Sequence, residues 1–332
     1  MTPTLDAREL VAWILTELEP SVRVGREAGH SARRRGDTAI ELYGVADMAC
    51  VLHTIGHLQP GSAERDGWSR AFATFRDHAT GQYLERDATH DPLHNTAFAL
   101  AAMALLGLAP PGPVAAVEEW RDPERVEPFL ASLDWERNVY ADSHRGAGLA
   151  SIIALTPDDR APAWFGRFFA ALDALVDPAN GMLGVDKPPG GDIDQIGGTF
   201  HYDFLYDWYR RRLPHAAARI DALLGLQEPS GHWFEAFPLW VNLDATYLLT
   251  RAVRVSHHRP GDAAAAVRSL VGAVWEATMA PGVRDSVFGA ELGVHSLTAA
   301  VSILAEAQLF LGGEEIVTDR PLRPVLDHRP FI

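Results

Sequence analysis

Cysteine and basic charge are both scarce in this chain of 332 residues. Its single cysteine, Cys50, cannot form an intramolecular disulfide or a zinc cage of thiolates. The 29 Lys and Arg residues are outnumbered by 44 Asp and Glu, which gives a formal net charge of −15. No basic stripe is available to neutralise a phosphate backbone, since the run Arg33-Arg34-Arg35 is too short. We therefore expect no nucleic-acid partner.

A long apolar run and a secretory leader are also lacking. The apolar stretch from Thr96 to Leu108 stops before Pro110, short of the roughly 18 apolar residues of a spanning helix. The first residues, Met1 to Thr4, do not begin a charged and then apolar leader. These features predict a soluble, cytoplasmic protein that is not an integral membrane protein. The length permits one large core, so we expect a single domain over residues 1–332.

Apolar residues recur at helical spacing in nearly every long segment, for example at Leu10, Ile14 and Leu18. Alternating strand patterns are rare. Helix-terminating residues such as Gly107 and Pro214 divide the chain into segments of roughly ten to thirty residues. The pattern predicts an all-α fold.

An internal repeat organises these helices. Six segments that open predicted helices align, and each carries an acidic or imidazole side chain at the same place. These positions are Asp47, His94, His144, His201, Asp244 and His295. Neighbouring positions lie 43 to 57 residues apart, which leaves room for two helices per unit. The repeat predicts an (α/α)6 toroid of six helix pairs around a central cavity, with the six side chains at one mouth. An open helical solenoid is the alternative.

Short turns with a glycine and then a large residue precede several of these helices. They place Gly81 before Tyr83, Gly181 before Leu183 and Gly231 before Trp233. Glycine permits the positive φ of a tight turn, and the large side chain can pack between adjacent helices.

The turn at Gln227, Gly231 and Trp233 resembles the glutamine-tryptophan repeat of terpenoid cyclases, and residues 77–83 and 177–183 look like degenerate copies. This resemblance implies an α/α toroid of the kind shared with protein prenyltransferase β subunits. The segment from Asn242 to Thr246 is similar to the Asp-x-Asp-Asp-Thr motif of class II terpenoid cyclases, but Asn242 and Ala245 replace two carboxylates. That resemblance implies that Asp244 protonates an alkene.

The motifs of related metal-dependent enzymes are missing. The Asp and Cys zinc ligands of prenyltransferases do not occur together near a histidine. Asp158-Asp159 is followed by Arg160-Ala161-Pro162, not by an aspartate-rich diphosphate motif. We expect no cofactor and no metal. Metal binding is the competing role of the six aligned side chains, because neutral imidazoles with Asp47 or Asp244 are acceptable transition-metal ligands.

The six aligned side chains, called the ring residues below, are the predicted catalytic residues. A carboxylic acid can protonate an alkene only if it stays neutral, and apolar burial of Asp244 would raise its pKa. His201 and His295 occupy the equivalent places on the flanking helices and could orient that proton or serve as acid or base. Asp47, His94 and His144 complete the set.

Aromatic and charged side chains near the ring positions are the predicted substrate-binding residues. Aromatic faces stabilise cations and also stack on sugars, while an arginine can receive a carboxylate or phosphate. The set comprises Phe200, Tyr202, Trp233, Trp240, Tyr247, Arg145 and Asp203.

Three functions follow from the predicted cavity. The first is a terpenoid-cyclase-like enzyme that performs acid-initiated cyclisation or isomerisation of an isoprenoid or polyene. The second is a carbohydrate-active enzyme, a hydrolase, lyase or epimerase, that uses His and Asp acid-base pairs. The third is a non-catalytic binding toroid. The partner is a small molecule, the oligomeric state stays open, and the tail over residues 312–332 is expected to pack on the barrel because it ends in Phe331-Ile332.

Overall fold

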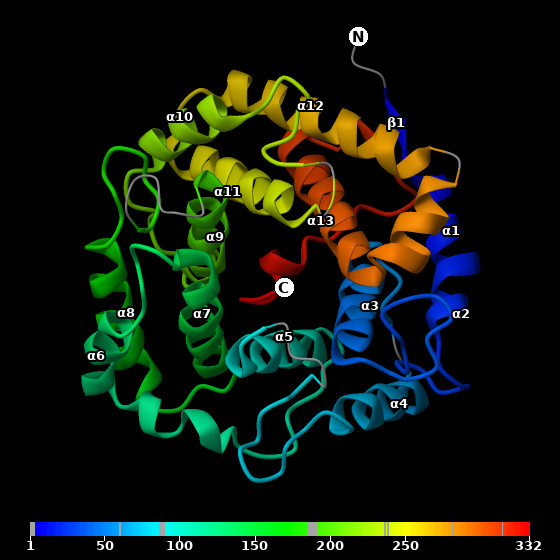
Figure 1. Cartoon of the computed structure of the whole chain (residues 1–332), viewed down its shortest axis with the longest axis horizontal. Coiled ribbons are helices and arrows are strands. Elements are labelled where there is room, and N and C mark those ends of the chain that lie inside the picture. The colour runs from blue at the N-terminus through cyan, green and yellow to red at the C-terminus, as the bar shows by residue number, and fades with distance from the viewer. Residues whose placement is uncertain are drawn as a thin grey trace.

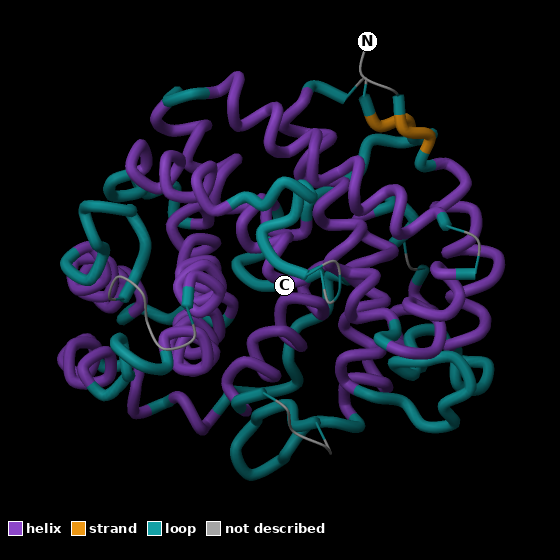
Figure 2. Tube along the Cα trace, turned by 45° about the horizontal axis from the view of Figure 1, so that its top comes forward, coloured by secondary structure: helices purple, strands orange, loops and turns teal. Residues whose placement is uncertain are grey.

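The computed structural model describes residues 4–59, 61–85, 90–184, 191–235, 237, 239–280, 282–313 and 315–332. It is mostly helical, with 62% helix and 3% strand, which confirms the predicted all-α class. In the part of the chain so described, the strands are β1 (Leu5–Asp6) and β2 (Ile316–Val317). They pair in parallel at the edge of the molecule (Figure 2) and join segments close to the two ends of the chain.

Six of the described α-helices contact one another in a closed succession. These inner helices are α3 (Leu42–Thr54), α5 (Pro92–Leu105), α7 (Val139–Leu155), α9 (Asp192–Trp208), α11 (Trp240–Ser256) and α13 (Val294–Leu311). Each packs against the next, and α13 packs against α3. They surround the centre of the view in Figure 1. One of the six aligned polar positions lies in each of them.

Most of the remaining elements lie outside these helices (Figure 1), whereas η6 of the C-terminal tail contacts α3 and α9. The outer α-helices are α1 (Arg8–Trp13), α2 (Glu19–Val22), α4 (Ser62–Ala73), α6 (Val126–Ala131), α8 (Ala161–Asp173), α10 (Ala216–Leu226) and α12 (Pro260–Met279). Shorter turns are η1 (Ile14–Leu18), η2 (Ala115–Val117), η3 (Glu119–Arg121), η4 (Pro123–Arg125), η5 (Asp285–Glu291) and η6 (Val325–Asp327). Outer helices are amphipathic: α8 buries Trp164, Phe168 and Leu172, while Gly166 is exposed.

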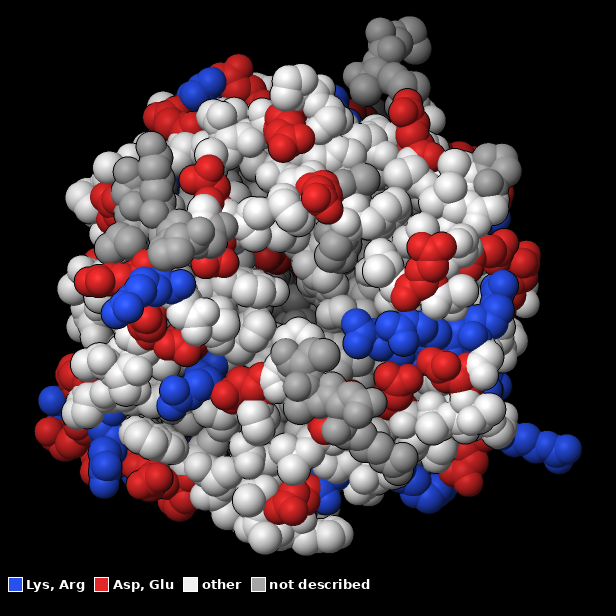
Figure 3. All heavy atoms as spheres, viewed as in Figure 1, with Lys and Arg blue, Asp and Glu red and all other residues white. Residues whose placement is uncertain are grey.

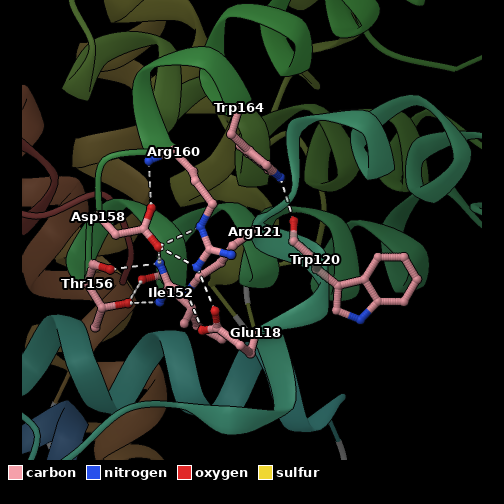
Figure 4. A network of polar contacts seen from close by, with 8 residues as sticks. All are labelled: Glu118, Trp120, Arg121, Ile152, Thr156, Asp158, Arg160 and Trp164. Atoms are coloured by element: carbon pink, nitrogen blue, oxygen red, sulfur yellow. Dashed lines mark hydrogen bonds and ion pairs between the residues drawn. The ribbon is translucent and has the colours of Figure 1, made fainter.

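A buried arginine joins one inner helix to the outer layer. Arg121 donates from Nη1 to the carbonyl oxygen of Thr156 at 2.8 Å and from Nη2 to Oγ1 of the same residue at 2.6 Å. Arg160 bridges Asp158 and Glu118 beside it (Figure 4). Because Thr156 directly follows α7, these bonds satisfy a helix end that lacks intrahelical partners.

The glycine turns have the conformation that the sequence predicts. Gly81, Gly181 and Gly231 have φ of +74°, +67° and +91°. A Cβ at Gly81 would lie 2.3 Å from the carbonyl oxygen of Pro113, so the turn packs too closely for any side chain there.

The residue two places after each of these glycines is bonded to an inner helix. The backbone amide of Tyr83 donates to Thr96, that of Leu183 to Thr199, and that of Trp233 to Asn242, at 2.8 to 3.1 Å. The three repeats therefore share the same hydrogen bond as well as the same sequence spacing. It also explains Asn242, which binds the turn where the resembling motif has a carboxylate.

Helix α13 is long and apolar enough to cross a membrane by length and composition, although the sequence analysis expected no such helix. In the structure 78% of that window is buried, against α3, α11 and α12. Its composition is that of a core helix.

The chain beyond α13 crosses the molecule and ends inside it. The carbonyl oxygen of Pro330 accepts a hydrogen bond from Ser151 Oγ at 2.8 Å. The ring of Phe331 is fully buried and lies 4.9 Å from the ring of His94 and 5.3 Å from that of Phe204. The C-terminal end accordingly lies at the centre of Figure 1, among the inner helices.

Candidate functional site

A cavity of about 330 Å³ lies among the inner helices. It is lined by Arg33, Arg34, His90, His94, Tyr140, Phe200, His201, Trp240, Asp244, Leu292, His295, Ser296 and Ile332. Figure 3 shows a hollow near the centre of one face, with a row of basic side chains beside it. A larger depression of about 1100 Å³ lies between α8, α10 and the end of α11, but it is more open and contains none of the six ring residues. The central cavity is therefore the candidate site.

Three of the ring histidines form a cluster at this cavity. His94, His144 and His201 are all buried, and each offers a ligand atom within 4.8 Å of the others. The ring centroids of His94 and His144 lie 4.5 Å apart, and those of His144 and His201 lie 4.9 Å apart. They come from α5, α7 and α9, three consecutive inner helices.

Close helix packing brings these rings together. A Cβ at Gly148 of α7 would lie 2.8 Å from the backbone nitrogen of His94, and a Cβ at Gly198 of α9 would lie 2.5 Å from Val139. Each glycine therefore allows its helix to approach the preceding one more closely than a larger residue would permit.

Hydrogen bonds fix the tautomer of two of the three imidazoles. The Tyr43 hydroxyl lies 3.0 Å from His94 Nδ1 and donates its proton to Asn95 Oδ1 at 3.1 Å. With the hydroxyl proton directed to Asn95, His94 Nδ1 would donate to this hydroxyl, which leaves a lone pair on Nε2. Ser143 Oγ likewise donates to the carbonyl oxygen of Tyr140 and lies 2.7 Å from His201 Nδ1, so His201 also keeps its lone pair on Nε2.

The third imidazole has an unsatisfied atom. Nε2 of His144 is buried and has no hydrogen-bond partner among the described residues. Burial lowers the pKa of His144 to about 4 and holds the pKa values of His94 and His201 well below the ordinary range. The other imidazoles of the cluster lower the pKa of His94 further by charge repulsion. The three rings are therefore neutral at physiological pH.

A histidine–aspartate pair lies on the other inner helices. His295 Nδ1 lies 3.0 Å from Oδ2 and 3.1 Å from Oδ1 of Asp47, whose side chain is fully buried. Its own side chain remains 14% exposed and lines the cavity, with the Trp240 ring 4.3 Å away. Asp47 thus orients the imidazole so that Nε2 is the atom free to meet a ligand.

Asp244 lines the same cavity from α11 and is 3% exposed. Its carboxyl group has no hydrogen-bond partner among the described residues. Burial raises its pKa well above the ordinary value, so the neutral acid is favoured. A Cβ at Gly197 would lie 3.4 Å from Asp244 Oδ2 and 2.5 Å from the Tyr140 ring, so this glycine leaves room for both side chains.

The structure brings the six predicted catalytic residues together but divides them into two groups. Asp47, Asp244 and His295 come from α3, α11 and α13, and the three clustered histidines come from α5, α7 and α9.

Among the predicted substrate-binding residues, Phe200 and Trp240 line the cavity. Tyr247 and Tyr202 are buried elsewhere in the core, and Trp233 Nε1 donates to the carbonyl oxygen of Leu223 at 2.7 Å. Asp203 forms a buried ion pair with Arg219. Arg145 is half-buried and is not a lining residue, so these five side chains do not form the cavity wall.

Several site residues were missed by the sequence analysis. Tyr43 and Ser143 fix imidazole tautomers, and Tyr140 lines the cavity. Tyr43 precedes Asp47 by four residues, and Tyr140 and Trp240 precede His144 and Asp244 by the same number, so this repeated aromatic position was a usable signal. Ser143 is adjacent to His144, and its position does not repeat in the other units. Arg33 and Arg34, considered only as a nucleic-acid contact, also line the cavity.

No protein-family model matches this chain, and no curated protein or solved structure matches it. The assignment of a function therefore depends on the geometry of the site.

Proposed function

We propose that the protein is a small-molecule enzyme of (α/α)6 toroid architecture that transfers protons to and from a substrate in the central cavity. The closed succession of contacts among the six inner helices supports the toroid. One observation supports the chemistry above all others. The Asp47–His295 pair directs an imidazole into a cavity that also holds the carboxyl group of Asp244.

These groups can act as base and acid in one reaction. His295 Nε2 would accept a proton from the substrate, and Asp47 would stabilise the resulting imidazolium. Asp244, whose pKa burial raises well above its ordinary value, would donate a proton at a second substrate atom. The substrate loses one proton and gains one in this sequence, which amounts to an isomerisation, an epimerisation or an acid-initiated cyclisation. Proton exchange with water then returns His295 to the neutral imidazole and Asp244 to the neutral acid.

The wall of the cavity favours a small polar substrate. Imidazoles, two arginines, a carboxyl group and a phenol contribute to the lining, and about 330 Å³ is little room for a long polyene. This lining supports the carbohydrate-type alternative over the isoprenoid one. The isoprenoid alternative is supported by Phe200 and Trp240, whose aromatic side chains line the same cavity as Asp244. The cytoplasmic location stays a prediction.

Exchange of substrate hydrogen atoms with solvent deuterium tests the proposal without a known substrate. A panel of sugars, hydroxy acids and isoprenoids is incubated with the protein in D2O, and deuterium uptake is measured by mass spectrometry. We expect uptake at a carbon of at least one compound. Asp47→Asn should slow it about 100-fold or more, because a positioned acid or base contributes about 10²–10⁴ in rate.

Asp37→Asn is the matched control, because Asp37 is exposed and lies outside the cavity wall. It should exchange at the wild-type rate. Undiminished exchange in folded Asp47→Asn would exclude the pair as the base, and the absence of exchange across the panel would contradict a proton-transfer enzyme for these substrate classes.

A further inference from the structure

We propose that Nε2 atoms of His94, His144 and His201 form a binding site for one divalent first-row transition-metal ion. This site goes beyond the proton transfer proposed above and does not depend on it. It also differs from the sequence analysis, which expected no metal.

The geometry of the cluster is the first argument. One ring nitrogen of each histidine lies within 4.8 Å of those of the other two, and the three rings come from three helices. Ligands at the roughly 2.0–2.1 Å of a zinc–imidazole bond stand about 3.3 Å apart around a tetrahedral ion. The three rings would have to turn towards one another to close this difference, and two of them, His94 and His201, line the cavity.

The hydrogen-bond network is the second argument. Tyr43 and Ser143 each engage an Nδ1 atom, so the Nε2 lone pairs of His94 and His201 are left available. Metal-binding imidazoles are held in this way, with the second nitrogen donating to a neighbouring acceptor.

The unsatisfied atom of His144 is the third argument. A buried polar atom without a partner costs about 1–3 kcal/mol, and several lone pairs that converge without a donor between them repel one another. A cation among the three Nε2 atoms removes both penalties.

The ligand type selects the ion. Three neutral imidazoles suit Zn²⁺, Co²⁺, Ni²⁺ or Fe²⁺, whereas Mg²⁺ and Ca²⁺ require oxygen ligands. Three protein ligands leave coordination positions open, which is the arrangement of catalytic zinc sites. Because His94 and His201 line the cavity, those positions would face it, and the ion could polarise a substrate oxygen or activate a water molecule there.

Cobalt titration of chelator-treated full-length protein tests the site. We expect visible d–d absorption bands that saturate at one Co²⁺ per chain, and competition by Zn²⁺. His144→Ala should weaken binding at least 100-fold. His57→Ala is the control, since His57 is exposed and outside the cavity, and it should bind as the wild type does.

A second variant leaves the ligands in place. Ser143→Ala removes the acceptor of His201 Nδ1, and we expect binding about 10- to 100-fold weaker. This result would support the site even if His144→Ala failed to fold by circular dichroism. A folded wild type without cobalt bands, or bands and affinity unchanged in both variants, would overturn the proposal. Because no substrate is used, failure of the metal site and failure of the proposed reaction are distinguishable.

Discussion

Single neighbouring groups determine the tautomer or the orientation of three imidazoles in this site. A hydroxyl group sets the tautomer of His94 and another sets that of His201, while a carboxylate orients His295. The sequence repeat locates the histidines because their spacing is regular. It does not locate Ser143, because a hydrogen-bond partner is chosen by distance in space and this position does not repeat. The position of Tyr43, four residues before Asp47, does recur at Tyr140 and Trp240.

Asp203 shows the opposite case, since its place on the same predicted helix as His201 suggested the substrate site. In the folded protein its carboxylate meets Arg219 in the core. The arginine lies 16 residues away on α10, and no local pattern links the two.

Acidification should destabilise the protein through His53, which lies away from the candidate metal ligands. Burial lowers the pKa of His53 from 6.5 to about 4, and its Nε2 has no hydrogen-bond partner among the described residues. Between these two values the unfolded chain binds the proton more tightly, so the free energy of unfolding falls as the pH falls. His53 is only partly buried, and we expect a contribution of about 1 kcal/mol.

Urea denaturation of wild type and His53→Leu at pH 7, 5.5 and 4 measures this contribution. The variant should lose about 1 kcal/mol less stability than the wild type over that range, whereas His57→Leu at an exposed position should follow the wild type. Parallel pH profiles for wild type and His53→Leu would show that His53 does not keep a lowered pKa.

At the scale of helices, small residues decide how closely α5, α7 and α9 approach. The sequence indicates small-residue helices, but it does not show which glycine faces a neighbouring backbone. Gly148 faces Leu93 and His94 across the contact between α7 and α5. This contact sets the separation of the His94 and His144 rings.

Replacing Gly148 with alanine should separate these helices. The new Cβ would meet backbone atoms of Leu93 and His94 at 2.8 Å, which cannot be relieved by a side-chain rotation. We expect a loss of about 1–3 kcal/mol in the free energy of unfolding. Cobalt affinity should fall with it, because the ligand geometry is disturbed.

Gly166→Ala in α8 is the matched control, since nothing lies within 4 Å of the added Cβ. It should stabilise the protein by about 0.5–1 kcal/mol, the ordinary advantage of alanine in a helix. Equal effects of the two substitutions in chemical denaturation would contradict the packing role assigned to Gly148.

At the scale of the whole molecule, the six inner helices, one from each sequence repeat, contact one another in succession and have a cavity among them. The all-α class, the glycine turns and the six polar positions follow from the sequence because helical periodicity and repeat spacing are local properties. The division of the six side chains into a cluster of three histidines and a second group that contains the Asp47–His295 pair does not follow from it. That division depends on side-chain directions, which the sequence pattern leaves undefined.

The most direct test of the account is X-ray diffraction from crystals of the cobalt-loaded protein at the cobalt absorption edge. We predict one anomalous peak bounded by the Nε2 atoms of His94, His144 and His201, at about 2.0–2.2 Å from each. The ordinary electron-density map of the same crystal should show the Asp47–His295 hydrogen bond intact. An anomalous peak elsewhere, or three unliganded imidazoles in a crystal soaked with cobalt, would contradict the account.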